Sequence, residues 1–150
     1  MQKSFEEELD IFKNALKKHS LKATPQRMAV HKAMLRLGHA SADMIVEEIK
    51  KDKETNITTA SIYNILSNLA DYGIYGRRLS SNNKMYFDVS TFRHIHIYDC
   101  ERHIYKDIVD DQLMDAIESR FKGRRFRGLS IESIDVQIVA KPTKRNLNLR

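Results

Sequence analysis

Residues 57–88, ITTASIYNILSNLADYGIYGRRLSSNNKMYFD, contain a change of period that decides the fold. Thr58 or Thr59 is a suitable N-cap for a helix. The apolar residues of this helix recur at helical spacing, at Ile62, Ile65, Leu66 and Leu69. Residues 74–79 and 84–87 then flank the polar turn SSNN, which predicts a β-hairpin. A helix followed at once by a short hairpin is typical of a winged helix-turn-helix.

Three further helices are predicted before this segment. The first carries an apolar stripe at Phe5, Leu9, Phe12 and Leu16. Thr24 and Pro25 are a good N-cap and first residue for a second helix, which we expect to stop at Gly38. Ser41 caps the third helix, whose inner residues are Met44, Ile45 and Ile49. The helices within 41–72 would form the helix-turn-helix, and residues 73–87 the wing.

The rest of the chain predicts a small β-β-α-β unit. Residues 93–98 and 103–108 alternate as strands, and Asp110 or Asp111 caps a helix. That helix points an apolar face inward through Leu113, Met114, Ile117 and Phe121. Residues 131–140 alternate again as a last strand. Because this unit has too little apolar surface to stand alone, we expect it to pair with a second copy.

These elements predict an α+β protein with two domains. Residues 1–88 would be a winged-helix DNA-binding domain, joined by a hinge at 88–92 to a dimerisation and metal-sensing domain at 93–140. Residues 141–150, KPTKRNLNLR, carry four basic groups and no acidic one. We expect them to form a solvated basic tail.

Composition narrows the class of protein. The 150 residues are 41% hydrophobic and 31% charged, with a net charge of +6. This balance is consistent with a nucleic-acid partner or with a merely basic surface. No apolar run has the length of a membrane span, the acidic amphipathic start is unlike a signal peptide, and Cys100 is the single cysteine. We therefore expect a cytoplasmic protein without a membrane partner, an intramolecular disulfide or a four-cysteine zinc site.

Histidines and carboxylates gather at the start of the second unit. His94 and His96 fall on one face of a strand, with Asp88 before it and Asp107 on the next strand. His39 lies upstream. Imidazole and carboxylate ligands without a thiolate suit Fe(II), Mn(II) or Zn(II). An H-x-H pair on a strand is also compatible with a coincidental surface pair.

Four motifs, in order, give the chain a family resemblance. They are LKATPQR at 21–27, HASADMI at 39–45, ITTASIYNIL at 57–66 and YFDVSTFRHIH at 86–96. Over about residues 16–140 the chain resembles the ferric uptake regulator family, and most of all its peroxide-sensing repressors. Two residues favour this subgroup. Iron sensors more often carry Glu at the position of Asp107, and they usually carry Arg at the position of Asn64.

The resemblance implies a regulatory metal and a switch. The family positions of the metal ligands fall on His39, Asp88, His94, His96 and Asp107. One ion bound by all of them would draw the two domains together and fix the spacing of two recognition helices. In the peroxide sensors, Fe(II) and peroxide add oxygen to a ligand histidine, the metal is lost and DNA is released. By position, His39 and His94 are the candidates for this oxidation.

The resemblance also implies a DNA surface. A homodimer would bind double-stranded DNA at an AT-rich palindromic operator. On the recognition helix the candidate contacts are Ser61, Tyr63 and Asn64, with Tyr63 against a thymine methyl. Lys22 matches a minor-groove position and Arg27 a phosphate contact. Arg77 and Arg78 on the wing would add phosphate contacts, or else be solvated.

The chain departs from the family at the structural zinc site. Both C-x-x-C pairs are absent, and Cys100 is their only remnant, one position out of register. Cys100 and His103 lie close in sequence, so a redox or haem role of Cys100 remains open. The alternative is that Cys100 is an inert cysteine in a turn. His19, His31 and His103 have no motif around them, and we expect ordinary surface or half-buried histidines.

Other functions also remain open from the sequence. One is a family regulator that responds to iron, manganese, zinc or haem. A small non-haem iron enzyme is more distant, because five protein ligands leave little room for a substrate. The last alternative is a DNA-binding protein that acts without metal and keeps only a vestigial metal site. We expect a regulator and not an enzyme.

Overall fold

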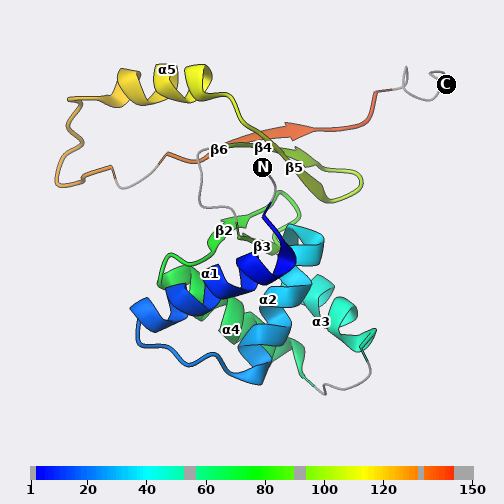
Figure 1. Cartoon of the computed structure of the whole chain (residues 1–150). Helices are drawn as coiled ribbons and strands as arrows, with labels where there is room; N and C mark the ends of the chain where they lie inside the picture. Colours follow the sequence, from blue (N-terminus) through cyan, green and yellow to red (C-terminus); the bar gives the residue numbers. More distant parts are fainter. Residues whose placement is uncertain (1–2, 53–56, 90–93, 132–133, 144–150) are drawn as a thin grey trace. The chain divides into compact units, whose positions relative to one another are not determined.

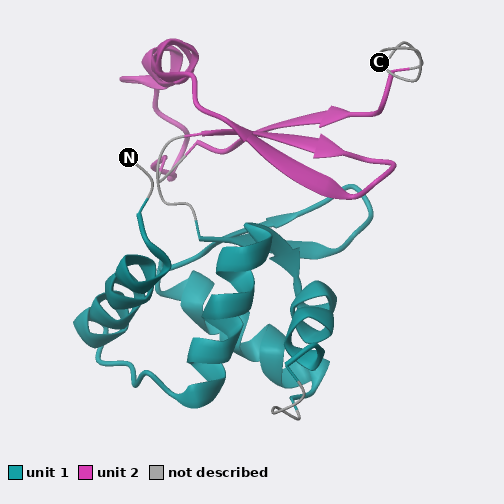
Figure 2. Ribbon diagram, turned by 45° about the vertical axis from the view of Figure 1, so that its right-hand side comes forward, with its two compact units in different colours: residues 1–91 teal, residues 92–150 magenta. Residues whose placement is uncertain are grey.

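A computed structural model describes residues 3–52, 57–89, 94–131 and 134–143. The chain divides into two compact units, residues 1–91 and 92–150, which Figure 2 draws in different colours. The predicted hinge at 88–92 and basic tail at 141–150 lie mostly outside the described residues. In the part that is described, no helix has the length and apolar character needed to cross a bilayer.

The helices of the first unit, labelled α1 to α4 in Figure 1, begin directly after the predicted type of capping residue. Helix α1 (Phe5–Lys18) has Ser4 as its N-cap, and helix α2 (Pro25–Leu37) has Thr24. Helix α3 (Ala42–Lys50) follows Ser41, and helix α4 (Thr59–Asp71) follows Thr58. Each capping hydroxyl accepts a backbone N–H of the first turn, which satisfies a group that has no partner inside the helix.

The first unit ends in a sheet with one strand more than the sequence predicts. Its antiparallel strands are β1 (His39–Ser41), β2 (Gly76–Leu79) and β3 (Met85–Asp88), in the order β1-β3-β2. Strand β1 was missed because three residues are too short to show a period. The hairpin starts later than predicted because the N–H groups of Ile74 and Tyr75 bond the Leu69 carbonyl at the end of α4.

One apolar core joins the helices of this unit to the sheet. Its most deeply buried members include Leu16, Val30, Met34, Ile45, Ile62, Leu66, Leu69 and Phe87. Full burial stabilises the fold by roughly 1.5–3 kcal/mol for each large apolar side chain. His31 also lies in the interior, stacked on Phe12 with ring centroids 3.8 Å apart. The expectation of a surface or half-buried His31 is therefore wrong: the face of α2 that carries it is closed by α1.

The second unit has the predicted β-β-α-β order. Strands β4 (Ile95–Asp99) and β5 (Ile104–Ile108) are antiparallel, helix α5 (Asp111–Phe121) follows, and β6 (Val136–Ala140) pairs with β4 in parallel. The sheet order is β5-β4-β6. The last strand begins at Val136 and not at residue 131. The α+β class, with a winged-helix unit followed by this unit, is confirmed.

Helix α5 differs from its predicted packing. Of the four side chains expected to point inward, Met114 is buried, Ile117 and Phe121 are half-buried, and Leu113 is 44% exposed. Further exposed apolar side chains of the second unit are Ile104, Ile108, Val109, Phe126, Leu129, Ile131, Ile138 and Val139. A single copy of this unit therefore leaves much of its apolar surface uncovered.

Candidate metal ligands and nucleic-acid interface

Two of the candidate ligands meet in the sheet of the first unit. His39 on β1 and Asp88 on β3 are register partners, and His39 Nδ1 lies 3.8 Å from Asp88 Oδ2. Opposed residues on antiparallel strands bring their side chains together on one face. Asp88 is only 2% exposed, so its carboxylate needs compensating charge. This unit therefore holds one imidazole and one carboxylate side by side.

Two residues of β2 also shape the surroundings of Asp88. Arg78 Nη2 lies 3.4 Å from Asp88 Oδ2, and the Arg78 side chain is only 9% exposed. The expectation that Arg78 reaches phosphate from the wing is wrong, because it faces the buried carboxylate. At Gly76, the register partner of Asp88, an added Cβ would lie 3.0 Å from Asp88 Oδ1. A side chain at this position would push the carboxylate away.

The other three candidate ligands meet in the sheet of the second unit. His96 on β4 and Asp107 on β5 are register partners, and His96 Nδ1 lies 3.0 Å from Asp107 Oδ1. His94, immediately before β4, places Nε2 at 3.6 Å from the same oxygen. The two imidazole rings have centroids 4.2 Å apart. Two imidazole nitrogens therefore converge on one carboxylate oxygen, as the H-x-H spacing predicts.

Sequence reasoning missed one acidic residue beside this cluster. Asp135 precedes β6, and its Oδ1 lies 3.4 Å from His96 Nε2. Asp135 belongs to no motif, and only the parallel pairing of β4 with β6 brings it to the histidines. The alternation of residues 134–138 was visible in the sequence, but not the strand that β6 would join.

The donor set fits a borderline or hard divalent cation. Its atoms are imidazole nitrogens and carboxylate oxygens, which suit Fe(II), Mn(II) and Zn(II) and disfavour soft metals. Cys100 is half-buried in the turn after β4, where its backbone N–H bonds the Ala140 carbonyl. The ring of His103 pairs with the Tyr98 hydroxyl through Nδ1, at 2.5 Å. The turn thus ties its histidine to a tyrosine of β4.

The predicted DNA contacts of α4 lie at its exposed start. Ser61 belongs to the N-terminal cap, where its hydroxyl accepts a hydrogen bond from Thr58 Oγ1 at 3.0 Å. Tyr63 is 44% exposed, and the edge of its ring packs on Phe87 with centroids 6.1 Å apart. Asn64 is exposed beside it, and both line a cleft of about 310 Å³ between the starts of α3 and α4 and residues 84–85. Tyr63 is thus an exposed aromatic side chain whose ring is held on one side by its contact with Phe87.

The basic candidates have different surroundings. Lys22 is exposed in the loop before α2. Arg27 is half-buried and donates to the Lys22 carbonyl at 2.8 Å and to Asn68 Oδ1 at 3.4 Å, so it links the loop to α4. Arg77 on β2 is 44% exposed and pairs with Asp71 at 2.8 Å. Of these basic candidates, Lys22 and Arg77 are the ones with exposed side chains.

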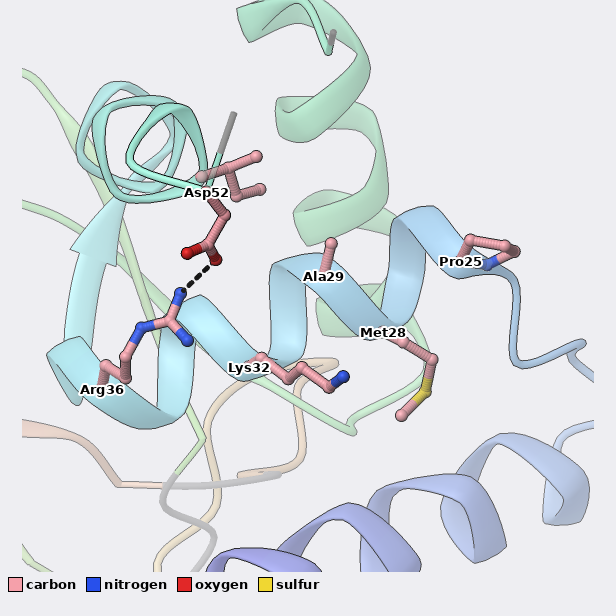
Figure 3. A pocket seen from close by; sticks show the side chains of 7 residues that line it. Pro25, Met28, Ala29, Lys32, Arg36 and Asp52 are labelled. Atoms are coloured by element: carbon pink, nitrogen blue, oxygen red, sulfur yellow. Dashed lines mark ion pairs between the residues drawn. The ribbon is translucent and has the colours of Figure 1, made fainter. Parts of the chain in front are cut away.

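An open cleft of about 500 Å³ lies elsewhere in the first unit, beside α2 (Figure 3). Arg36 Nη2 and Asp52 Oδ2, 3.6 Å apart, pair across it. Its other lining residues are Pro25, Met28, Ala29, Lys32 and Ile49. None of these is a predicted ligand or DNA contact, so the cleft provides no substrate space at the candidate metal ligands.

A family model named "Ferric uptake regulator family" matches residues 18–138. The chain belongs to this family. It is 33% identical over 100 residues to the peroxide-responsive repressor PerR of Staphylococcus epidermidis, which is 66% of this chain and 65% of that protein. The match therefore spans slightly less than two thirds of the curated relative.

Solved structures agree with the family assignment. The peroxide stress regulator of Campylobacter jejuni is 30% identical, with a TM-score of 0.64 over 88% of this chain and 96% of that one. The ferric uptake regulator of Vibrio cholerae, at 20% identity, shares the fold, with a TM-score of 0.71 over 87% and 98%. Other solved structures with this fold are ferric uptake regulators with manganese or with iron, a zinc-bound manganese uptake regulator, and a zinc uptake regulator complexed with zinc and DNA.

Proposed function

We propose that this chain is a metal-dependent transcriptional repressor of the ferric uptake regulator family that responds to peroxide. It would act in the cytoplasm as a homodimer on an AT-rich palindromic operator. The observation that carries the proposal is the division of the candidate ligands. His39 and Asp88 lie together in one unit, and His94, His96 and Asp107 lie together in the other. The 33% identity to a peroxide-responsive repressor supports the choice of signal.

The metal would be Fe(II) or Mn(II), with Zn(II) as a further candidate. His39, Asp88, His94, His96 and Asp107 would hold it. Neither unit alone supplies more than three of these donors, so a full ligand set needs both. Since residues 88–94 join the two units, binding of one ion would restrict their relative motion.

This restriction would couple metal to DNA. In a homodimer, DNA binding needs two recognition helices at a fixed spacing. A metal that favours the arrangement with that spacing raises DNA affinity, and by linkage DNA raises metal affinity equally. Residues 1–88 would bind DNA, and residues 93–140 would dimerise and sense the metal.

The surface of α4 supports the DNA-binding role. Tyr63 would contact a thymine methyl, with Ser61 and Asn64 beside it. Lys22 and Arg77 would contact the backbone, with residues 141–150 as a basic tail. The internal hydrogen bonds of Arg27 favour a supporting role that holds the Lys22 loop on α4.

The exposed apolar side chains of the second unit support the homodimer. Leu113 and Val139 are 44% and 54% exposed, and α5 buries little of its apolar face within one copy. A second copy would remove this surface from water, which stabilises the pair at about 25 cal/mol per Å² of apolar area. Since the chain has a single cysteine and no C-x-x-C pair, packing and not a four-cysteine zinc site would hold the dimer.

For the peroxide signal, bound Fe(II) would catalyse the transfer of one peroxide oxygen to a ligand imidazole, which is the group oxidised, and the other oxygen would leave as water. His39 and His94 are the imidazoles proposed to gain an oxygen atom. The protein holds them close to carboxylates, His39 at 3.8 Å from Asp88 and His94 at 3.6 Å from Asp107. An oxidised imidazole is a poorer ligand, so the metal and then the DNA would be released.

The test is DNA binding by the purified full-length chain with and without metal. We expect Mn(II) to raise affinity for an AT-rich palindrome, and a chelator to remove the gain. Affinity should also fall with rising salt. Equal affinity with and without chelator would favour metal-independent DNA binding, and no salt-dependent DNA binding at all would favour a small iron enzyme.

The signal is tested on the same complex. Dilute peroxide should release the Fe(II)-loaded protein from DNA and leave the Mn(II)-loaded protein bound. If both stay bound, the proposed signal is wrong, and titrations with iron, manganese, zinc and haem should then identify the ligand that controls DNA affinity.

A further inference from the structure

Three possible donor atoms of the second unit lie close together, one from each histidine and one from Asp107. His96 Nδ1 lies 3.0 Å and His94 Nε2 3.6 Å from Asp107 Oδ1. Donors that each bind an ion at about 2.1 Å lie roughly 3–3.5 Å from one another. The 3.0 Å separation of His96 Nδ1 from Asp107 Oδ1, which is also a hydrogen-bond distance, falls in this range. Since His94 Nε2 approaches the same oxygen, Nδ1 is the nitrogen of His96 that faces the other candidate ligands of this unit.

The opposite nitrogen of the same ring faces a different carboxylate. His96 Nε2 lies 3.4 Å from Asp135 Oδ1. Strand pairing explains this position, because Val136 pairs with Ile95 in parallel, which brings the preceding Asp135 level with His94. The two nitrogens of an imidazole point away from each other, so Asp135 cannot share an ion with Nδ1.

The tautomer of His96 gives this second contact a role. A metal takes the lone pair of one ring nitrogen, and the other nitrogen keeps its proton. With the metal on Nδ1, the proton is on Nε2 and needs an acceptor, since His96 is only 2% exposed. Asp135 Oδ1, 3.4 Å away, reaches hydrogen-bond distance of Nε2 after a shift of a few tenths of an ångström.

We propose that Asp135 is a positioning residue for the regulatory metal. It accepts a hydrogen bond from His96 Nε2–H, holds the ring in the tautomer whose Nδ1 carries the lone pair that the metal takes, and makes that nitrogen a stronger donor. This inference rests on the proposed function in one respect, namely that His96 is a metal ligand.

Neighbouring contacts join the strands on the two sides of His96. Tyr105 on β5 places its ring edge-on to His96, with centroids 6.3 Å apart, and its hydroxyl donates to Gln137 Oε1 at 3.1 Å. Gln137 is the register partner of His96 on β6. The strand that begins directly after Asp135 is thus joined by a side-chain hydrogen bond to the strand that carries Asp107.

The first experiment measures Zn(II) affinity of the full chain by competition with a chromophoric chelator. Asp135→Ala should lower affinity about 10- to 100-fold. Asp135→Asn, which keeps the shape and a neutral acceptor, should lower it less. Glu101→Gln is the matched control, because it removes the same charge from an exposed turn of this unit and should leave affinity unchanged.

The second experiment reads the tautomer directly, by ¹⁵N-detected imidazole shifts of the Zn(II)-loaded protein. We expect the His96 proton on Nε2 and zinc on Nδ1, with the Nε2 signal moved by Asp135→Ala and unmoved by Glu101→Gln. A merely structural role for Asp135 would not move this signal. Zinc on Nε2, or unchanged affinity and spectrum in Asp135→Ala, would overturn the inference.

Asp107→Ala separates this inference from the proposed function. If wild-type protein binds Zn(II) and Asp107→Ala weakens binding, but Asp135→Ala does not, only the role of Asp135 is wrong. If wild-type protein binds no Zn(II), or Asp107→Ala binds as well as wild type, the proposed metal site and the role of Asp135 both fall.

Discussion

The two sets of candidate ligands differ in how their carboxylates are compensated. In the first unit, Asp88 lies beside a permanent cation, with Arg78 Nη2 at 3.4 Å, and beside His39 at 3.8 Å. In the second unit, Asp107 lies against His94 and His96. An imidazole offers a metal a lone pair, whereas a guanidinium offers none. In the proposed site, the second unit would therefore meet the metal without displacing a permanent cation, whereas Asp88 of the first unit would have to exchange its contact with Arg78 for the metal.

The largest effect should follow from loss of Asp107, on which the donors of the second unit converge. Asp107→Ala should weaken Mn(II) binding by more than about 100-fold, because loss of a direct ligand exceeds the effect of a residue behind it. Mn(II) titration followed by electron paramagnetic resonance measures this. Asp111→Ala, at the exposed start of α5, is the control. If Asp107→Ala binds Mn(II) as well as the wild type does, the second unit does not supply the main ligands of the metal.

His31 gives the first unit an acid sensitivity that is independent of its ligands. Burial lowers the pKa of His31 to about 4, although an interaction with the Glu8 backbone opposes this. The unfolded chain binds the proton near pH 6.5, so the free energy of unfolding should fall by about 3 kcal/mol as pH drops from 6.5 to 4. Stability above pH 6.5 should not change from this cause.

Chemical denaturation of the metal-free protein across this pH range checks the effect of His31. His31→Phe, which keeps the stack on Phe12, should flatten the slope. An equally steep slope in His31→Phe would show that other groups, such as the ligand histidines, cause the acid sensitivity.

Gly76 tests the first unit's carboxylate without removing it. Gly76→Ala places a Cβ 3.0 Å from Asp88 Oδ1 and should displace it, which weakens Mn(II) binding about 10-fold. Ser81→Ala, in the exposed turn of the same hairpin, should leave binding unchanged. Isothermal titration calorimetry compares them. Normal binding in Gly76→Ala would mean that Asp88 is not positioned by β2.

Arg78 and Arg77 form a matched pair on neighbouring positions of β2. Arg78→Gln removes the cation beside Asp88, so it should raise Mn(II) affinity several-fold and lower the stability of the metal-free protein. Arg77→Gln should leave metal affinity unchanged and reduce the salt dependence of DNA binding by about one ion. Lower metal affinity in Arg78→Gln would show that Arg78 supports the site instead of competing with the metal.

Local signals in the sequence predicted the helices and most of the site. Thr24, Ser41 and Thr58 cap helices because capping acts within a few residues, and His94 and His96 share a face because alternation is a property of one strand. What failed depends on distant pairing. Strand β1 is defined by β3, and Arg78 points inward because β2 meets Asp88. Asp135 reaches His96 only through the parallel pairing of β6 with β4.

The most direct test of the account loads the full-length protein with Fe(II), adds dilute peroxide and maps the product by peptide mass spectrometry. We expect one added oxygen atom on His39 or His94, and none when Mn(II) replaces Fe(II). Such oxidation would support both the ligand set and the signal. A demonstrably iron-loaded protein whose histidines gain no oxygen would contradict the peroxide mechanism.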